Sequence, residues 1–171
     1  MRIRTAQPAD LDTIAGIYNG EVLGSVATMD TVARSAAEFE AWLEDHPPAT
    51  YPVLVADDGA GSVLGWASLT PFSPRLGYRR CAEVSVYVHR DHRATGVGSS
   101  LLGELVRLAP TVGIVHLVAR IESSGEASLR LHSGQGFERV GTLHQVAEKF
   151  GRVLDVVLME RRVGDASQRP D

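Results

Sequence analysis

A glycine-punctuated turn near the middle of the chain has the residue types that bind phosphate. The stretch from His89 to Leu102 reads HRDHRATGVGSSLL, with Gly96 and Gly98 between strand-forming and helix-forming residues. Glycine permits positive φ and close backbone approach, so successive N–H groups can point at an anion. The following helix adds the positive end of its dipole, and Arg93 adds a full charge. Two glycines before a helix are also common in ordinary tight turns, so the turn alone leaves both interpretations open.

A carboxylate lies shortly before this turn. The segment 81–88, CAEVSVYV, predicts a strand with Glu83, Ser85 and Tyr87 on one face and valines on the other. A carboxylate in such a position can accept a proton from a reacting group. Spacing alone nevertheless favours a solvated strand carboxylate.

The segments around these residues predict one α+β, or mixed α/β, domain over residues 1–163. Residues 164–171 are small or polar and predict a disordered tail. The segment 21–30 lacks helical periodicity and is predicted to be a loop. The predicted elements are a strand at 1–5, helices at 8–19 and 35–45, a hairpin of 51–56 with 63–70, a strand at 81–88, a helix at 99–109, a strand at 113–121, a helix from 125 to 134 or 136, and a strand pair within 140–163.

Composition narrows the classes of function. A net charge of −4 argues against a nucleic-acid-binding protein, since such domains usually carry a basic excess. The single cysteine, Cys81, offers no internal disulfide, and the histidines show no metal-ligand spacing. The sequence contains no secretory signal and no run approaching the roughly 18 apolar residues of a membrane span. We therefore expect a cytoplasmic protein without a bound metal and without a membrane or nucleic-acid partner.

The turn and its surroundings resemble a known superfamily. The segment VYVHRDHRATGVGSSLL is similar to the acyl-coenzyme A signature of the GNAT N-acetyltransferases, with Arg93, Gly96 and Gly98 as its R-x-x-G-x-G turn. AQPADLDTIAGIYN, GYRRCAEVSVYVHRDHR, SLRLHSGQGFERVGTL and KFGRVLDVVLMER resemble the phosphinothricin N-acetyltransferase branch, which includes methionine sulfone and methionine sulfoximine acetyltransferases. The resemblance spans Arg2 to Arg161. It implies a GNAT fold, a central and mostly antiparallel twisted sheet flanked by helices, and a homodimer.

The resemblance implies acetyl-CoA as the cosubstrate. Its pyrophosphate is expected on residues 93–99, and its pantetheine arm beside the strand that precedes them. Where the branch usually has an asparagine that contacts coenzyme A, this chain has Gly125. Two alternatives follow: Ser124 or Ser128 supplies that hydrogen bond, or the cofactor binds more weakly. The implied contacts are Val86, Tyr87, Val88, Arg93, Ala94, Thr95, Gly96, Val97, Gly98, Ser99, Ser124 and Ser128.

The resemblance also implies the catalytic groups. The branch assigns the glutamate at the position of Glu83 as the base that deprotonates the amine, and a strand N–H can polarise the thioester carbonyl. His132 matches a histidine that is sometimes given a catalytic role, although a histidine on an inner helix face is typical of a hydrogen-bonded core. Tyr87 is a candidate acid for the leaving thiolate, although a tyrosine on such a strand is usually packed. Cys81 is expected to be inert packing.

Several residues are candidates for substrate contacts. Thr28 and Met29 lie in the segment GSVATMD, which takes the place of a substrate loop of the branch. Tyr78, Arg79 and Arg80 enter the strand at 81–88, and arginine suits a carboxylate or phosphinate. Exposed loop charges are an equally good interpretation of the two arginines. A further candidate contact, in the motif KFGR, is Lys149.

We therefore expect an N-acetyltransferase that moves the acetyl group of acetyl-CoA to the α-amine of a small amino-acid-like substrate. Phosphinothricin, methionine sulfoximine and methionine sulfone are the best candidates. Another amine remains an alternative, namely a different amino acid, a polyamine or a protein N-terminus. So does a non-catalytic acyl-CoA-binding sensor.

Overall fold

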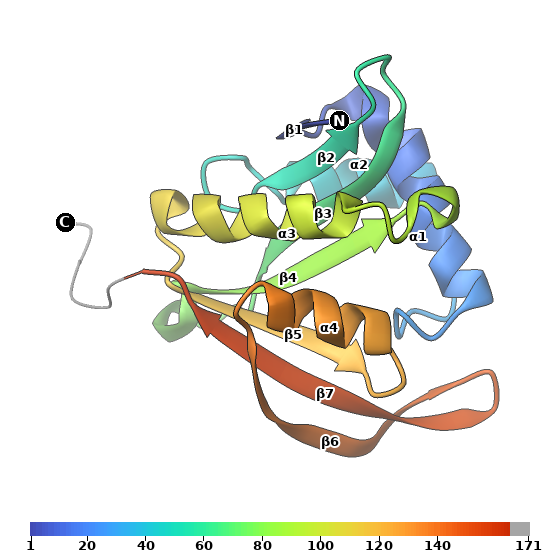
Figure 1. Cartoon of the computed structure of the whole chain (residues 1–171), viewed down its shortest axis with the longest axis vertical. Helices are drawn as coiled ribbons and strands as arrows, with labels where there is room; N and C mark the ends of the chain where they lie inside the picture. Colours follow the sequence, from blue (N-terminus) through green and yellow to red (C-terminus); the bar gives the residue numbers. More distant parts are fainter. Residues whose placement is uncertain (165–171) are drawn as a thin grey trace.

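The computed structural model describes residues 1–164 and shows a seven-stranded sheet with helices on both faces (Figure 1). The strand order is β1-β2-β3-β4-β5-β7-β6, and all neighbours are antiparallel except β4 and β5. The predicted α+β fold with a mostly antiparallel sheet is confirmed. Of the predicted tail, residues 165–171 lie outside the described part. The elements are β1 (Arg2–Thr5), α1 (Leu11–Gly24), α2 (Ala36–Glu44), β2 (Val53–Asp57), β3 (Val63–Pro71), β4 (Cys81–Val88), α3 (Val97–Leu108), β5 (His116–Glu122), α4 (Glu126–Gly134), β6 (Glu138–Lys149) and β7 (Arg152–Arg162).

Alternating side chains of the strands bury two cores, one on each face of the sheet. On β2, Leu54 and Ala56 belong to the core under α3, whereas Val55 belongs to the core under α1 and α2. The leucines Leu101 and Leu105 of α3 have no exposed surface. The period-2 pattern of the strands thus fixes which helix covers which face.

Helix α1 is longer than the sequence analysis predicted. It continues to Gly24, so the prediction of a loop from residue 21 was wrong for residues 21–24. Val22 is 1% exposed and extends the buried stripe of Ile14 and Tyr18 at a spacing of four residues. The burial of Val22 favours the helical conformation of residues 21–24, although the apolar periodicity of this segment is weak.

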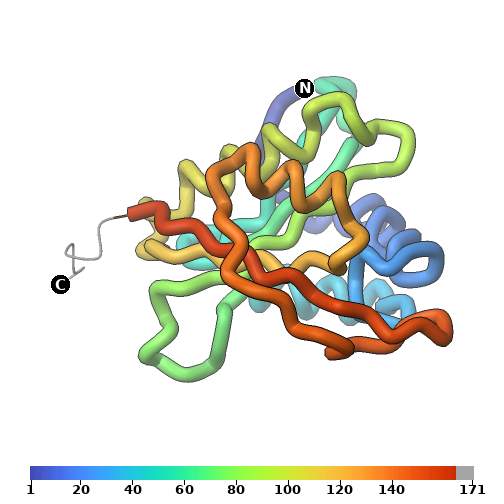
Figure 2. The backbone as a smooth tube through the Cα atoms, turned by 60° about the horizontal axis from the view of Figure 1, so that its bottom comes forward, coloured from blue at the N-terminus to red at the C-terminus, as the bar shows by residue number. Residues whose placement is uncertain are grey.

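The β6–β7 hairpin reaches the segment that follows α1, as the turned view shows (Figure 2). At its tip Lys149 is 3% exposed, and its Nζ donates a hydrogen bond of 2.8 Å to the carbonyl oxygen of Thr28. The C-terminal strands thereby hold the loop after α1 against the sheet.

No helix within residues 1–164 is long and apolar enough to cross a membrane.

Candidate active site

Strands β4 and β5 separate halfway along their length. They pair in parallel only from Cys81 with His116 to Glu83 with Val118. Beyond Glu83, β4 stays paired with β3, and β5 stays paired with β7. The edge of β4 from Ser85 to Val88 therefore has no strand partner on the β5 side and can pair with an amide-bearing ligand.

A pocket of about 550 Å³ opens at this separation. Side chains of β3, β4 and β5 line it, together with α4, the β6–β7 hairpin and the segment after α1. It brings together residues that lie far apart in the sequence and that the sequence analysis marked as candidates: Thr28, Met29, Glu83, Val86, Tyr87, Ser128 and His132.

Glu83 lies at the last pair before the strands separate, and it forms an ion pair with Arg120 of β5. Arg120 Nε donates a hydrogen bond of 2.8 Å to Glu83 Oε1, and its Nη2 donates to Oε2. The Glu83 side chain is 19% exposed and that of Arg120 is 59% exposed. The hydrogen bond to Glu83 raises the pKa of Arg120 above its ordinary value. Glu83 lines the pocket, and both of its carboxylate oxygens accept hydrogen bonds from one guanidinium.

Tyr87 belongs to an aromatic wall of the pocket. Its ring centroid lies 4.8 Å from that of Trp66 and 5.1 Å from that of Tyr18. Burial raises the pKa of the Tyr87 phenol well above its ordinary value of 10. The phenol therefore stays protonated at neutral pH, but its raised pKa makes it a weaker acid than an ordinary tyrosine, which does not favour the predicted role as an acid.

His132 is a buried, neutral imidazole in the pocket wall. It is 4% exposed, and its Nδ1 lies 2.9 Å from the carbonyl oxygen of Ser128. Because a carbonyl only accepts hydrogen bonds, Nδ1 carries the proton and Nε2 presents a lone pair. That Nε2 has no partner among the described residues. Burial lowers the pKa of His132 below 6.5.

The glycine turn has the backbone geometry that its sequence predicts. Gly96 has a φ of +90° and caps α3, which begins at Val97, two residues before the predicted start. The first hydrogen bond of the helix runs from Ser100 N to the Gly96 carbonyl oxygen. The N–H groups of Val97, Gly98 and Ser99 thus precede any helical acceptor and are available to an anion.

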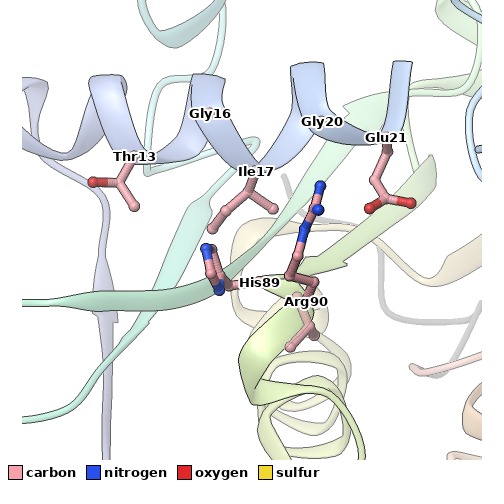
Figure 3. A pocket seen from close by; sticks show the side chains of 8 residues that line it. Thr13, Gly16, Ile17, Gly20, Glu21, His89 and Arg90 are labelled. Atoms are coloured by element: carbon pink, nitrogen blue, oxygen red, sulfur yellow. The ribbon is translucent and has the colours of Figure 1, made fainter. Parts of the chain in front are cut away.

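Arg93, the charged residue of the turn, is bound to α1. Its guanidinium forms an ion pair with Glu21, and Nε lies 3.4 Å from the carbonyl oxygen of Val88. A second pocket of about 340 Å³ lies beside this pair, between α1 and the end of β4 (Figure 3). Arg90 points across it toward Gly20 and Glu21. These contacts fix the turn against α1, so α1 helps to set the position of the predicted pyrophosphate site.

Comparisons with known proteins agree with this arrangement. The family model described as an acetyltransferase (GNAT) domain matches residues 3–158. The chain belongs to the GNAT acetyltransferase family. It is 40% identical to an L-methionine sulfoximine/L-methionine sulfone acetyltransferase of Pseudomonas aeruginosa, over 98% of each chain. It is also 40% identical to an L-amino acid N-acyltransferase of Escherichia coli, over 100% of this chain and 98% of that one. The structure of a putative acetyltransferase from Salmonella typhimurium with its cofactor acetyl-CoA superimposes with a TM-score of 0.94, at 38% identity, over 100% of this chain and 98% of that one.

The residues of this GNAT chain fit acetyl-CoA, which GNAT acetyltransferases use. The unpartnered edge of β4 offers amide and carbonyl groups, and the start of α3 offers free N–H groups. Ser124, one of the two serines expected to replace the missing asparagine, donates its hydroxyl proton to Glu122 and is left only as an acceptor. Ser128 lines the pocket, its Oγ 3.4 Å from His132 Nδ1. Gly125 is the N-cap of α4.

Four predicted substrate contacts lie outside the pocket of this GNAT chain. Tyr78 ends a 3₁₀ turn and packs on Phe72, with ring centroids 5.4 Å apart. Neither Arg79 nor Arg80 belongs to the pocket lining. The Nζ of Lys149 is engaged by the backbone of Thr28, and burial lowers its pKa. Their assignment as substrate contacts remains a prediction.

Two charged residues of β5 that line the pocket, Arg120 and Glu122, were not predicted from the sequence. Glu122 is 5% exposed and accepts hydrogen bonds from the backbone N–H and the hydroxyl of Ser124. Arg120 lies within the segment 113–121, which was predicted as a buried strand, and Glu122 follows it directly; charged side chains at such positions are costly to bury unless they are paired. Their presence was therefore a signal that this strand borders a polar cavity.

We expect the GNAT domain to lose stability as the pH falls below about 6.5. Burial lowers the pKa of both His46 and His132 below 6.5, the ordinary value. The unfolded chain therefore takes up protons near pH 6.5 that the folded chain binds only at lower pH, which favours unfolding there. Melting temperatures at about pH 7.5 and about pH 5.5 measure this effect. The decrease should be smaller in His46→Gln, and an equal decrease in that variant would contradict the assignment.

Proposed function

We propose that the chain transfers the acetyl group of acetyl-CoA to the α-amine of a small amino-acid-like substrate. The best candidates are methionine sulfone, methionine sulfoximine and phosphinothricin, because proteins of similar sequence carry those names. The observation that carries the proposal is the position of Glu83. Its carboxylate lies inside the pocket at the point where β4 becomes free to pair with a ligand.

The chemistry follows from what the pocket residues can do. Acetyl-CoA, when bound, supplies a thioester carbon that an uncharged amine attacks directly. Glu83 accepts the proton that an ammonium group must lose before it becomes a nucleophile. Free N–H groups of β4 stabilise negative charge on the carbonyl oxygen, and the Tyr87 hydroxyl, which lines the pocket wall, is the candidate hydrogen-bond donor to the leaving thiolate.

The binding of acetyl-CoA is assigned to the turn and to the open strand edge. The N–H groups at the start of α3 receive the pyrophosphate, supported by the positive end of the helix dipole. Arg93 contributes charge there while it remains tied to Glu21. Residues Val86 to Val88 provide the pairing edge for the pantetheine amides.

Release of thiol from acetyl-CoA tests the proposal. The purified protein should release thiol rapidly with methionine sulfone, methionine sulfoximine or phosphinothricin, and slowly with a polyamine or a peptide that has a free N-terminus. Turnover that is confined to the polyamine or the peptide would reassign the substrate class. Measurable acetyl-CoA binding with no turnover on any amine would instead favour a sensor.

We further propose a cytoplasmic homodimer. The support for a dimer is the number of exposed apolar side chains on the β6–β7 hairpin, since exposed apolar surface often marks protein interfaces. Sedimentation at micromolar concentration should show a dimer, and a monomer there would contradict the proposal; cell fractionation tests the compartment. These exposed side chains are Val140, Leu143, Val146, Phe150 and Val153, of which Leu143 and Val146 also line the pocket.

A further inference from the structure

Arg120 is a cation inside the pocket for which the proposed mechanism has no role. It lies on β5 beyond the last residue pair with β4, and its side chain is 59% exposed. Its guanidinium donates hydrogen bonds to both carboxylate oxygens of Glu83, the proposed base. Arginine binds carboxylates through two parallel hydrogen bonds, so the same guanidinium suits the acid group of a ligand.

Of the two arginines that line the pocket, Arg120 is the better partner for the acid group of a ligand. Among the described lining residues the cations are Arg34 and Arg120. Arg34 is held by Asp30, with an N–O distance of 2.8 Å, and its guanidinium lies 5.0 Å from the centre of the Tyr18 ring. Its backbone N–H also donates to the side chain of Asn19. The Arg34 guanidinium is therefore held by both Asp30 and the Tyr18 ring. Arg120, in contrast, is paired with Glu83, which the proposed reaction needs as its base.

We infer that the Glu83–Arg120 ion pair recognises an α-amino acid. The pair separates when the zwitterionic substrate binds, and each of its two residues then pairs with one charged group of the substrate. The substrate carboxylate takes the Arg120 guanidinium, and the substrate ammonium takes the freed Glu83 carboxylate. This assignment rests on the proposed function and names the residue that selects its substrate class.

Charge balance and geometry both favour the exchange. One ion pair is replaced by two, so neither Glu83 nor Arg120 is left without an oppositely charged partner once the substrate is bound. The two ionic groups of an α-amino acid are attached to the same carbon, which matches the adjacent positions of Glu83 and Arg120. Each oxygen of Glu83 accepts one hydrogen bond from Arg120, and this acceptor position becomes free for the ammonium group when Arg120 binds another anion. An amine without a carboxylate cannot supply that anion, so it meets a base that is still occupied.

The test compares two substrates in four proteins. The substrates are methionine sulfone and 3-(methylsulfonyl)propylamine, which is the same molecule without its carboxylate. The proteins are the wild type, Arg120→Met, Arg120→Lys and, as a matched control, Arg107→Met, which removes an exposed arginine paired with Glu104 on α3. Arg120→Met should lower kcat/KM for methionine sulfone by about 10- to 100-fold, mainly through KM, because it removes a charge-assisted contact. Its kcat/KM for the amine should stay the same or rise, and Arg120→Lys should recover part of the loss.

The outcomes separate this inference from the proposed function. Turnover of methionine sulfone by the wild type establishes the function, and the inference then fails if Arg120→Met lowers kcat/KM equally for both substrates or for neither. It also fails if Arg79→Met, rather than Arg120→Met, produces the loss that is specific to the carboxylate. If the wild type acetylates no amino acid, both fail together. Melting temperature and acetyl-CoA affinity, measured on every variant, exclude a folding defect as the cause.

Discussion

The Glu83→Gln protein should retain its fold and its affinity for acetyl-CoA but lose about 10²- to 10⁴-fold in kcat, the usual contribution of a general base. Glutamine keeps the size of the side chain and one hydrogen-bond acceptor for Arg120, yet its amide cannot take a proton from an ammonium group. The rate of thiol release at saturating substrate measures the loss.

Two controls make this result specific. Glu104→Gln removes a carboxylate that pairs with Arg107 on the surface of α3, and it should leave kcat unchanged. The activity of Glu83→Gln should also recover partly at high pH, because more of the amine is then already deprotonated. A kcat within a factor of about three of the wild type would rule out Glu83 as the base.

Phe39→Ala should give the largest loss of stability among single changes near the pocket. Phe39 is 1% exposed, and its ring lies edge-on to Tyr18 and to Trp42, with centroids 5.9 Å apart in both cases. Truncation of such a side chain costs about 3–5 kcal/mol in the free energy of unfolding. For a domain of this size, that corresponds to a fall in melting temperature of about 10 °C.

The same change should weaken substrate binding, because both neighbours of Phe39 line the pocket. Phe39→Leu fills most of the space and should cost much less in stability and in KM. Calorimetry and steady-state kinetics on the two variants provide the comparison. Equal melting temperatures for Phe39→Ala and the wild type would show that α2 contributes little to the core.

The regular parts of this fold could be predicted from the sequence because their signals are local. The alternation of valines in β4 predicts that Tyr87 and the valines face opposite sides, and the two cores confirm it. Gly96 could be predicted as a turn residue because its positive φ is a property of glycine itself. The length of α1 could not, since Val22 is buried by contacts with residues distant in the sequence.

The contacts of the site that could not be predicted from the sequence are pairings between segments far apart in the chain. Glu83 could be singled out from its strand and from the resemblance, but its partner Arg120 lies 37 residues further along the chain. Their contact depends on the register of β4 against β5, which local patterns do not specify. The ion pair of Arg93 with Glu21 spans 72 residues and was missed for the same reason.

The separation of β4 from β5 also has a mechanical consequence. Within the sheet, three residue pairs join the strands β1 to β4 to the strands β5, β6 and β7. A ligand that pairs with the open edge of β4 adds contacts where β4 and β5 separate. A ligand that binds the folded state but not the unfolded state raises the free energy of unfolding. The supply of acetyl-CoA in a cell would then govern the rigidity and proteolytic lifetime of this protein as well as its rate of turnover, and limited proteolysis with and without acetyl-CoA would reveal the difference.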